Sequence, residues 1–592
     1  MKILGISCYF HDASAALIED GVLVAAAEEE RFTRVKHDFS FPKNAIDFCL
    51  GKGGVASQEL DYVVFFEKPF TKFERLLKTS LQGFPRTYWM FVQSMRTWLF
   101  DKLWIKGLII DTLGIDSKKV LFSEHHLSHA ASAYFCSPFE ESAILTFDGV
   151  GEWATTTMGT GKGNHLKIDE EIHFPHSLGL LYSAFTAFLG FEVNEGEYKV
   201  MGMAPYGSPK YVDEVYKVIQ LNEDSSFWLD TSYLSFHHST KRSFTNKLTD
   251  LLGPARDPDV PFFTKDSGYP SYFGPRPDNF DELSSYNQHY ADIAASIQSV
   301  AEDMILSLAK EACRRSNSKN LCMAGGVALN SVANGRILRE TPVENIYIQP
   351  SAGDGGCSLG AALYTWHCAL GNDKPRFTMN HAYWGESYDD DRVRLAVEST
   401  GLSYQYIPDS EELANMTVDR LQSGKVVGRF DGRFEWGPRA LGNRSILADP
   451  RIAEMKDIVN TKIKFREPFR PFAPSVTVES AENYFDLPNA ESNMAARFML
   501  LVTDVLEDKK EIIPAVSHMG TARVQTVHKD VSPSYHRLIQ KFGESTGVPV
   551  LLNTSFNIRG EPIVTTPEDA LRTFFNSGID TVVLGNHILD KK

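Results

Sequence analysis

The same succession of short strands occurs twice in the N-terminal part of this chain. The residue pattern predicts three strands in each copy, at residues 2–9, 15–19 and 22–28, and again at 142–147, 154–159 and 165–169. The first turn of each copy carries an aspartate, Asp12 in one and Asp148 in the other. We therefore expect an α/β domain made of two ribonuclease-H-like halves, as in the actin/hexokinase fold, with the two turns facing one another across a nucleotide cleft.

Two histidines and two aspartates suggest a metal site in this domain. His125 and His129 are four residues apart, so on a helix they share a face and can grip one cation. Asp148 and Asp354 each follow a strand and can reach the same cleft. This mixed nitrogen and oxygen set suits Fe(II), Mn or Zn, and ligand type alone does not choose among them.

The same residues also have a purely structural interpretation. Ser123 and Glu124 resemble a cap region, so the histidines after them can be an ordinary helix start, with His126 at the surface or in the cap. Aspartates often close turns. Their joint occurrence with the glycine loops described below favours the metal site.

Length and composition limit the possible classes of protein. A chain of 592 residues is expected to hold at least two domains, and 43% hydrophobic with 23% charged residues is typical of a soluble globular protein. Seven cysteines without a C-x-x-C pair indicate a reducing, cytoplasmic setting. The net charge of −16 argues against a nucleic-acid partner. A polar stretch at 371–376 predicts a boundary between domains 1–375 and 376–592.

The aromatic-rich stretch 88–110 is the segment nearest in character to a membrane span. Charged residues interrupt it well short of the roughly 20 apolar residues needed to cross a bilayer. No secretory signal is visible, because His11 and Asp12 interrupt the first apolar run. We interpret 88–110 as an amphipathic helical insertion that forms core or partner surface, and we expect no membrane partner.

Glycine loops after strands indicate a nucleotide site. An apolar stripe predicts a helix over 290–315, followed by a strand that runs into Gly325 and Gly326. A further strand at 345–349 leads to the loop of Asp354. Glycines between a strand and a helix let a ligand approach the backbone and its N–H groups.

The second domain contains a basic segment in an acidic chain. Residues 429–470 carry ten Lys/Arg against six Asp/Glu, a local excess of +4. Arg523 and the 553–557 segment follow in the same domain. Arginine binds phosphate oxygens bidentately and lysine adds a point charge, so this set suits a triphosphate or an acyl phosphate.

With these residues assembled, the sequence resembles the O-carbamoyltransferases of the nodulation, cephamycin and tobramycin type. The shared motifs occur in family order over both domains, at residues 11–16 (HDASAA), 28–32 (EEERF), 125–129 (HHLSH), 147–149 (FDG), 196–202 (GEYKVMG), 325–330 (GGVALN), 466–474 (REPFRPFAP) and 552–557 (LNTSFN). The resemblance implies an N-terminal domain like the tRNA threonylcarbamoyl transferases and a C-terminal YrdC-like α/β domain.

The resemblance also implies an activity. The YrdC-like domain would make carbamoyl adenylate from carbamoyl phosphate and ATP, with Mg as the companion of ATP, and the N-terminal domain would pass the carbamoyl group to a hydroxyl of a small-molecule, natural-product-like acceptor. Tyr9 stands where the aminoglycoside-modifying members have an acidic residue, so the resemblance does not extend to an aminoglycoside acceptor.

Roles carry over residue by residue. The metal, Fe(II) in the family, would be held by His125, His129, Asp148 and Asp354, and His11 would be the candidate base. Carbamoyl phosphate and ATP would contact Arg439, Arg444, Lys464, Arg523, Asn553 and Ser555. The adenylate would be held by Lys36, Gly325, Gly326 and Asn330.

The chemistry makes this division reasonable. A carbamoyl carbon is a poor electrophile, so a mixed anhydride and a Lewis acid both help, and an imidazole can accept the proton of the attacking alcohol. Two other classes stay open: an actin-like or chaperone-like ATP switch, and an ATP-independent metallohydrolase. Neither needs a separate basic domain.

Overall fold

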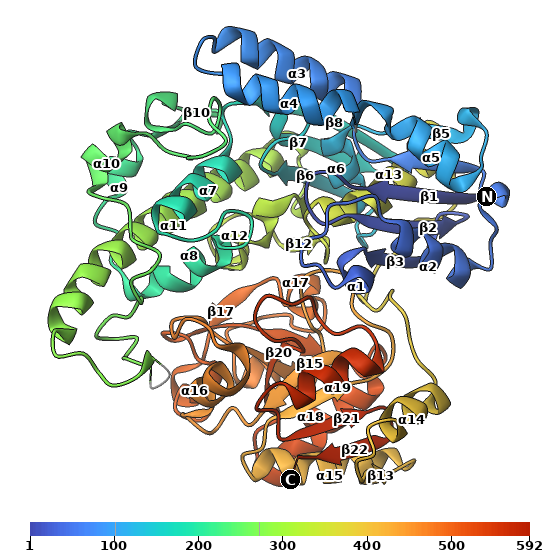
Figure 1. Ribbon diagram of the computed structural model, residues 1–592, viewed down its shortest axis with the longest axis vertical. Coiled ribbons are helices and arrows are strands. Elements are labelled where there is room, and N and C mark those ends of the chain that lie inside the picture. Colours follow the sequence, from blue (N-terminus) through green and yellow to red (C-terminus); the bar gives the residue numbers. More distant parts are fainter. Residues whose placement is uncertain (101, 271–272, 592) are drawn as a thin grey trace. The chain divides into compact units, whose positions relative to one another are not determined.

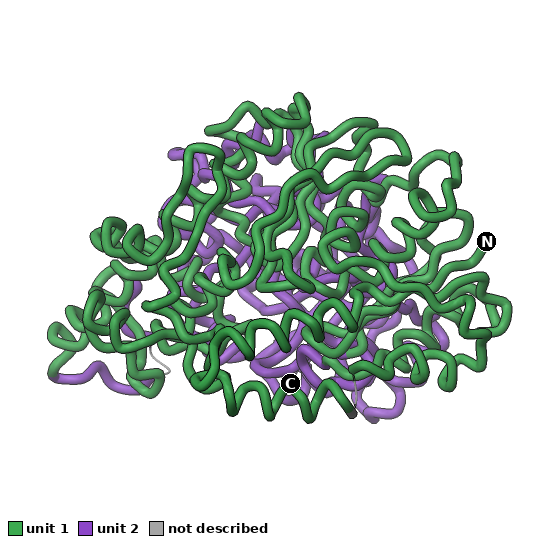
Figure 2. The backbone as a smooth tube through the Cα atoms, turned by 90° about the horizontal axis from the view of Figure 1, so that it is seen from above, with its two compact units in different colours: residues 1–29, 39–266, 279–379 green, residues 30–38, 267–278, 380–592 purple. Residues whose placement is uncertain are grey.

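The computed structural model describes residues 1–100, 102–270 and 273–591, which fall into two compact units. Unit 1 comprises residues 1–29, 39–266 and 279–379, and unit 2 comprises 30–38, 267–278 and 380–592 (Figure 2). Two short stretches of the N-terminal part thus belong to unit 2, which a single boundary at 375/376 does not describe. No helix in the described part of the chain is long and apolar enough to cross a membrane.

Unit 1 contains two five-stranded sheets with the same topology. The first has the order β3-β2-β1-β4-β5 and the second β8-β7-β6-β11-β12. In each sheet the first three strands in sequence are antiparallel and the last two join in parallel. The strands are β1 Lys2–Ser7, β2 Ser14–Glu19, β3 Val22–Glu28, β4 Tyr62–Phe65, β5 Val120–Phe122, β6 Glu141–Phe147, β7 Ala154–Lys162, β8 His165–His173, β11 Asn320–Ala324 and β12 Asn345–Ile348. The predicted duplicated ribonuclease-H-like fold is confirmed.

Two helices connect the sheets of unit 1. Helix α13 (Cys357–Tyr364) packs on β1 and β2 of the first sheet, helix α6 (His125–Tyr134) packs on β6 and β11 of the second, and the two helices pack on each other. A Cβ at Gly360 would lie 1.8 Å from the carbonyl oxygen of Ser128, so only glycine permits this close approach. The turns at the strand ends of both halves therefore meet beside one helix pair.

The remaining helices of unit 1 cover the outside of this core (Figure 1). The predicted helix 290–315 is confirmed within α11 (Phe280–Ser316), which has acidic residues in its first turn, arginines in its last, and a left-handed cap at Asn317. The others are α2 Lys43–Gly53, α3 Pro69–Gln82, α4 Tyr88–Phe100, α5 Ile105–Leu113, α7 Leu178–Phe188, α8 Glu197–Met203, α9 Val212–Val215, α10 Asn246–Leu252 and α12 Ser331–Glu340, with a small ribbon of β9 Ile219–Leu221 and β10 Phe227–Leu229.

Unit 2 is built on a mixed sheet of eight strands in the order β13-β22-β21-β14-β15-β20-β16-β19. Its core lies between this sheet and helices α15 and α18, where Leu421, Val427, Ile539, Phe542 and Leu551 are buried. The strands are β13 Gln405–Tyr406, β14 Val427–Phe430, β15 Arg444–Ala448, β16 Ala473–Thr477, β19 Gln525–Val527, β20 Val550–Ser555, β21 Thr581–Leu584 and β22 His587–Asp590, with a separate pair β17 Val502–Asp504 and β18 Thr521–Arg523. The helices are α1 Glu30–Thr33, α14 Asp390–Glu398, α15 Ser410–Gln422, α16 Met455–Val459, α17 Met494–Arg497, α18 Pro533–Thr546 and α19 Pro567–Phe575. The predicted C-terminal α/β fold is confirmed.

Candidate functional site

Four buried side chains meet at the strand ends of unit 1. His125 and His129 lie one turn apart on α6, Asp148 follows β6, and Asp354 opens the turn before α13. Their ligand atoms all lie within 4.8 Å of one another. The Nε2 atom of His125 is 3.3 Å from Asp148 Oδ2 and 3.6 Å from Asp354 Oδ1, and Nε2 of His129 is 3.7 and 3.5 Å from the same two oxygens. The structure therefore brings together all four residues predicted to bind a metal.

The spacing of the ligand atoms suits a bound metal better than it suits direct hydrogen bonds between the four side chains. Both ring nitrogens of His129 and Oδ2 of Asp354 are buried without a hydrogen-bond partner among the described residues. Separations of 3.5 and 3.7 Å are too long for good hydrogen bonds. Ligand atoms each about 2.1 Å from one ion lie roughly 3.0 to 3.5 Å apart, close to the spacing here. The set suits Fe(II), Mn or Zn, and its chemistry does not distinguish among them.

The electrostatics of the cluster follow from its burial. Burial alone would raise the pKa of Asp148, but the imidazoles of His125 and His129 outweigh it and hold that pKa well below its usual value. Gly326 donates its N–H to Asp148 Oδ1 at 3.0 Å, which also favours the carboxylate. Asp148 is thus a carboxylate at neutral pH, the form that ligates a cation.

One sequence-based assignment in this region was wrong. His126 is neither at the surface nor in a cap: it is buried, and its Nδ1 lies 2.7 Å from the Thr146 hydroxyl on β6. Burial, with the two neighbouring imidazoles, lowers the pKa of His126 well below its usual value. His126 is therefore neutral and packs inside the unit. It is buried because other elements cover α6 on more than one side.

Three charged residues that the sequence analysis did not single out surround His125. Glu152 accepts a hydrogen bond from the backbone N–H of His125 at 3.1 Å. Glu124, which the sequence placed in the cap region, makes no capping hydrogen bond with its side chain. Glu67 lies 3.9 Å from His125 Nδ1 and is paired with the buried Lys72. These groups orient His125, as outer carboxylates commonly orient metal ligands. No local sequence motif marks them, because they come from separate elements.

His11 lies in the turn between β1 and β2, beside the same cluster. Its Nδ1 is 2.6 Å from Asp12 Oδ2, which orients the ring. Burial alone would lower the pKa of His11, but Asp12, with Asp354 and Asp148, raises it to about 9. Lys102 donates to the Tyr9 carbonyl, and the Lys72 ammonium lies 4.9 Å from the Phe10 ring centroid, so two lysines support this turn.

The glycine loop after β11 approaches the same cluster. Gly325 has φ +100°, and a Cβ there would lie 2.2 Å from the Phe147 carbonyl oxygen, so the position requires glycine. The side chain of Asn330 caps α12 by accepting from the Ala333 N–H at 3.2 Å, and it pairs with Gln298. Lys36 follows α1 in unit 2, whereas the other expected adenylate contacts lie in unit 1. The role of all four stays a prediction.

Unit 2 contains a group of crowded cations. Burial, together with the charges of Arg439, Arg466 and Arg470, lowers the pKa of Arg523 well below its usual value. Burial, with the charges of Arg466 and Arg470, also lowers the pKa of Lys464 well below its usual value. We call Arg439, Lys464, Arg466, Arg470 and Arg523 the cation cluster. Lys464 is buried and the four arginines are partly buried. Like charges gathered in such a place are costly; Glu467, 3.5 Å from Arg470, offsets one of them, and a bound phosphate would offset more.

The sequence analysis assigned three members of this cluster and missed Arg466 and Arg470. Both belong to the motif at 466–474, which was noted in the resemblance without a role for its arginines. The alternation of arginine with Pro468 and Pro471 was the available signal, since proline fixes the backbone that carries the side chains.

Lys464 joins the cation cluster to the end of β20. Its Nζ donates to the Ser555 carbonyl at 2.5 Å and to Asn557 Oδ1 at 2.7 Å, and it lies 3.3 Å from the Ser555 hydroxyl. Asn553, also on β20, is buried, and its amide donates to the Ala440 carbonyl at 3.1 Å and to Gln525 Oε1 at 2.9 Å. The predicted residues Lys464 and Ser555 are therefore in contact, and Asn553 bonds the residue after Arg439.

Arg444 has a different environment. It is fully buried on β15, its guanidinium carbon lies 3.6 Å from the Phe430 ring centroid, and it donates to the backbone carbonyls of Asp431, Gly432 and Asn443. Burial lowers its pKa to about 10, against the raising effect of Glu435. These contacts account for the buried position of Arg444 by packing alone. Its contact with a phosphate stays a prediction.

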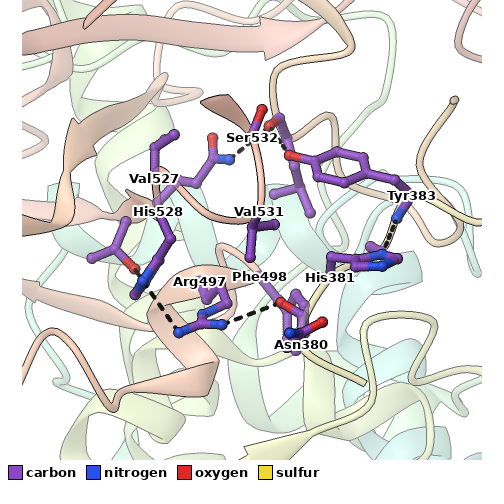
Figure 3. A pocket seen from close by; sticks show the side chains of 13 residues that line it. Asn380, His381, Tyr383, Arg497, Phe498, Val527, His528, Val531 and Ser532 are labelled. Carbon is purple, nitrogen blue, oxygen red and sulfur yellow. Dashed lines mark hydrogen bonds between the residues drawn. The ribbon is translucent and has the colours of Figure 1, made fainter. Parts of the chain in front are cut away.

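A separate recess lies beside β19 in unit 2 (Figure 3). Arg497 crosses it, donating to the Asn380 carbonyl at 3.4 Å and lying 3.2 Å from His528 Nδ1. Burial and Arg497 lower the pKa of His528 to about 4, so this imidazole is neutral at physiological pH. None of the residues predicted from the sequence to bind a ligand lines this recess.

Comparison with known proteins places both units in one family. A family model described as carbamoyltransferase N-terminus matches residues 2–363, and one described as carbamoyltransferase C-terminus matches 418–591. Relatives include the uncharacterized protein sll1178 of Synechocystis, 46% identical over 100% of this chain and 96% of its own length. Nodulation protein NolNO of Sinorhizobium fredii is 36% identical over 99% of this chain and 79% of its own. Among solved structures, HypF of T. kodakarensis (13% identity, 62% of this chain, 48% of that chain, TM-score 0.32) is too distant to support an argument.

Proposed function

This chain belongs to the carbamoyltransferase family, and we propose that it uses carbamoyl phosphate and ATP to make carbamoyl adenylate and passes the carbamoyl group to a hydroxyl of a small-molecule acceptor. In the net reaction, carbamoyl phosphate, ATP and one water give carbamoyl adenylate, pyrophosphate and phosphate. The acceptor oxygen then displaces AMP and loses its proton.

The observation that carries the proposal is the cation cluster of unit 2. Arg523 is held beside three further arginines that lower its pKa, an arrangement that an anionic ligand would relieve. A triphosphate and an acyl phosphate are anions of the right kind for arginine forks and for the ammonium of Lys464. We assign Arg439, Lys464 and Arg523 to these phosphates, with Asn553 and Ser555 beside them.

The transfer step is assigned to the four-ligand cluster of unit 1. His125, His129, Asp148 and Asp354 would hold the metal, which when bound supplies a Lewis acid for the carbonyl oxygen. His11 is the proposed base, with its Nδ1 bonded to Asp12. A cation held by Asp148 and Asp354 would offset two of the carboxylate charges that raise the His11 pKa, and this would favour the neutral imidazole that a base requires. Gly325, Gly326, Asn330 and Lys36 are the proposed adenylate contacts.

The test is the fate of ATP. Incubated with ATP, Mg and carbamoyl phosphate, the protein should release pyrophosphate, and omission of carbamoyl phosphate should stop this release. ADP formed without carbamoyl phosphate would instead indicate an ATP switch. Carbamoyl phosphate hydrolysis at full rate without ATP would indicate a metallohydrolase. Either result would remove the proposal.

A further inference from the structure

The helices α3 and α4 form a hairpin inserted between β4 and β5 of unit 1. Figure 1 shows them side by side at the edge of the unit, and the rings of Phe73 and Trp98 meet between them at 6.0 Å. The inner side of α3 is anchored by Arg75, which donates to the Gly151 carbonyl at 2.6 Å. On α4, Gln93 accepts a hydrogen bond from the Thr240 hydroxyl at 3.3 Å, so both helices are tied to the unit.

The outer side of this hairpin is apolar and exposed. Trp89, Val92 and Leu99 recur at helical spacing on one face of α4 and are 77%, 42% and 49% exposed. The neighbouring apolar side chains are more than 60% exposed: Phe70, Leu81, Phe84 and Trp104. Seven large apolar side chains exposed on one hairpin and the turn after it are more than the scattered exposure of a typical surface and indicate an interaction surface.

The charge of the hairpin is opposite to that of the chain. Residues 68–106 carry eight Lys/Arg against two Asp/Glu, while the whole chain carries −16. Four of these cations do not add to the outer charge, because Lys72 and Arg75 are buried and Lys68 and Lys78 are paired with Glu124 and Glu74. The cations that lie among the apolar side chains, Arg86, Arg96 and Lys106, are exposed. The partner of this surface is therefore expected to be both apolar and anionic.

We propose that the α3–α4 hairpin docks on the surface of an anionic lipid bilayer. Tryptophan, tyrosine and phenylalanine side by side with arginine and lysine are the residues that enter the headgroup region, the rings at the acyl boundary and the cations at lipid phosphates. This proposal replaces two sequence-based expectations: that the segment forms core or partner surface, and that the protein has no membrane partner.

Two observations favour a bilayer over a protein. In a symmetric contact between two copies of this chain, the exposed Arg86, Arg96 and Lys106 of one hairpin would face those of the other, and like charges repel. The apolar side chains also project far from the surface, with Phe70, Leu81 and Trp89 at 74%, 75% and 77% exposure. Projecting side chains suit a layer that deforms around them.

Sedimentation with vesicles tests the proposal on the full chain. Vesicles of phosphatidylcholine with 30% phosphatidylglycerol (about one anionic lipid in three, enough for a negative surface) should sediment the protein, and pure phosphatidylcholine vesicles should do so at least tenfold less well. A double variant, Phe84→Ser with Trp89→Ser, should bind at least tenfold more weakly. Leu395→Ser in α14 is the matched control, since Leu395 is also exposed, at 59%, and should bind like the parent.

The assay distinguishes docking on lipid from loss of the fold and from self-association. Thermal unfolding of the double variant should match that of the parent, because the two side chains project into solvent. Equal sedimentation of parent and double variant, or none of the parent with anionic vesicles, would overturn the proposal. A dimer of the parent that the double variant breaks, without vesicle binding, would overturn it in favour of self-association. None of these outcomes depends on the proposed carbamoyl transfer.

Discussion

At the scale of single residues, substitution of His129 distinguishes two interpretations of α6: that it carries metal ligands, or that its histidines only pack the helix. His129→Ala should reduce bound metal to less than about a tenth of one equivalent and stop carbamoyl transfer, while carbamoyl-phosphate-dependent pyrophosphate release persists. The reason is that the cation cluster lies in another unit and shares no residue with this site. Metal analysis and the two half-reactions, measured on one preparation, give the result.

His126→Gln is the control for that substitution. His126 is on the same helix and buried, but it bonds Thr146 instead of facing the carboxylates. It should retain metal and lose only stability, by the 1–3 kcal/mol typical of a buried hydrogen bond that is disturbed. Equal metal loss in both variants would show that the helix, not the ligand, matters.

His11 is predicted to be protonated in the metal-depleted protein. Its folded pKa of about 9 exceeds the usual 6.5, so its contribution to stability is fully present below about pH 6.5 and is lost as the pH rises through about 9. NMR titration of the labelled imidazole should show the high value, and Asp12→Asn should lower it, since the 2.6 Å contact is a main cause. Asp20→Asn, at an exposed distant turn, should leave it unchanged; an unshifted His11 in the Asp12 variant contradicts the account.

Substitution of Arg523 tests the phosphate site more directly than substitution of Arg444. Arg523→Met should abolish pyrophosphate release yet leave the unfolding temperature equal or higher, because it removes repulsion from Arg439, Arg466 and Arg470. Inorganic phosphate should raise the unfolding temperature of the parent and not of the variant. Arg394→Ala, which breaks an exposed pair with Asp391 on α14, is the control and should release pyrophosphate normally. Normal release by Arg523→Met contradicts the assignment.

At the scale of elements, the loop after β11 depends on one glycine. Gly325→Ala places a Cβ 2.2 Å from the Phe147 carbonyl oxygen at φ +100°, so we expect destabilisation by about 2–4 kcal/mol and weaker metal binding, since the Gly326 N–H bonds Asp148. Gly107→Ala, within α5 and with no atom within 4 Å of the new Cβ, should instead raise stability by up to about 1 kcal/mol. Denaturant unfolding measures both. Similar stability of the two variants would refute the close approach.

The helices and strands also show which structural features could be predicted from the sequence and which could not. Strand spacing and the aspartates at the first turns predicted the three antiparallel strands of each sheet, because period-two patterns and turn residues are local signals. The parallel strands β4 and β5 of the first sheet were not predicted. The pairing of α6 with α13 was not predictable, since it depends on close contact at Gly360. His126 was misplaced because a helix covered on several sides has no polar face to reveal.

At the scale of the whole molecule, the division into units was the harder inference. Residues 30–38 and 267–278 leave the N-terminal part and join unit 2. The second stretch is rich in proline and glycine, but this composition predicts a loop and does not show which unit the loop joins. Glu67 and Glu152 lie beside His125 through the tertiary fold, which single-sequence patterns do not encode. Arg466 was missed for another reason, since its motif was noted without a role for its arginines.

The central claim is that unit 2 makes an adenylate that unit 1 consumes. The most direct measurement uses carbon-labelled carbamoyl phosphate and ATP labelled at the α-phosphate, without acceptor, followed by rapid quenching and separation of nucleotides. The account predicts one nucleotide that carries both labels, formed with one pyrophosphate per molecule and absent from Arg523→Met. ADP as the labelled product, or pyrophosphate release with no doubly labelled nucleotide, would contradict it.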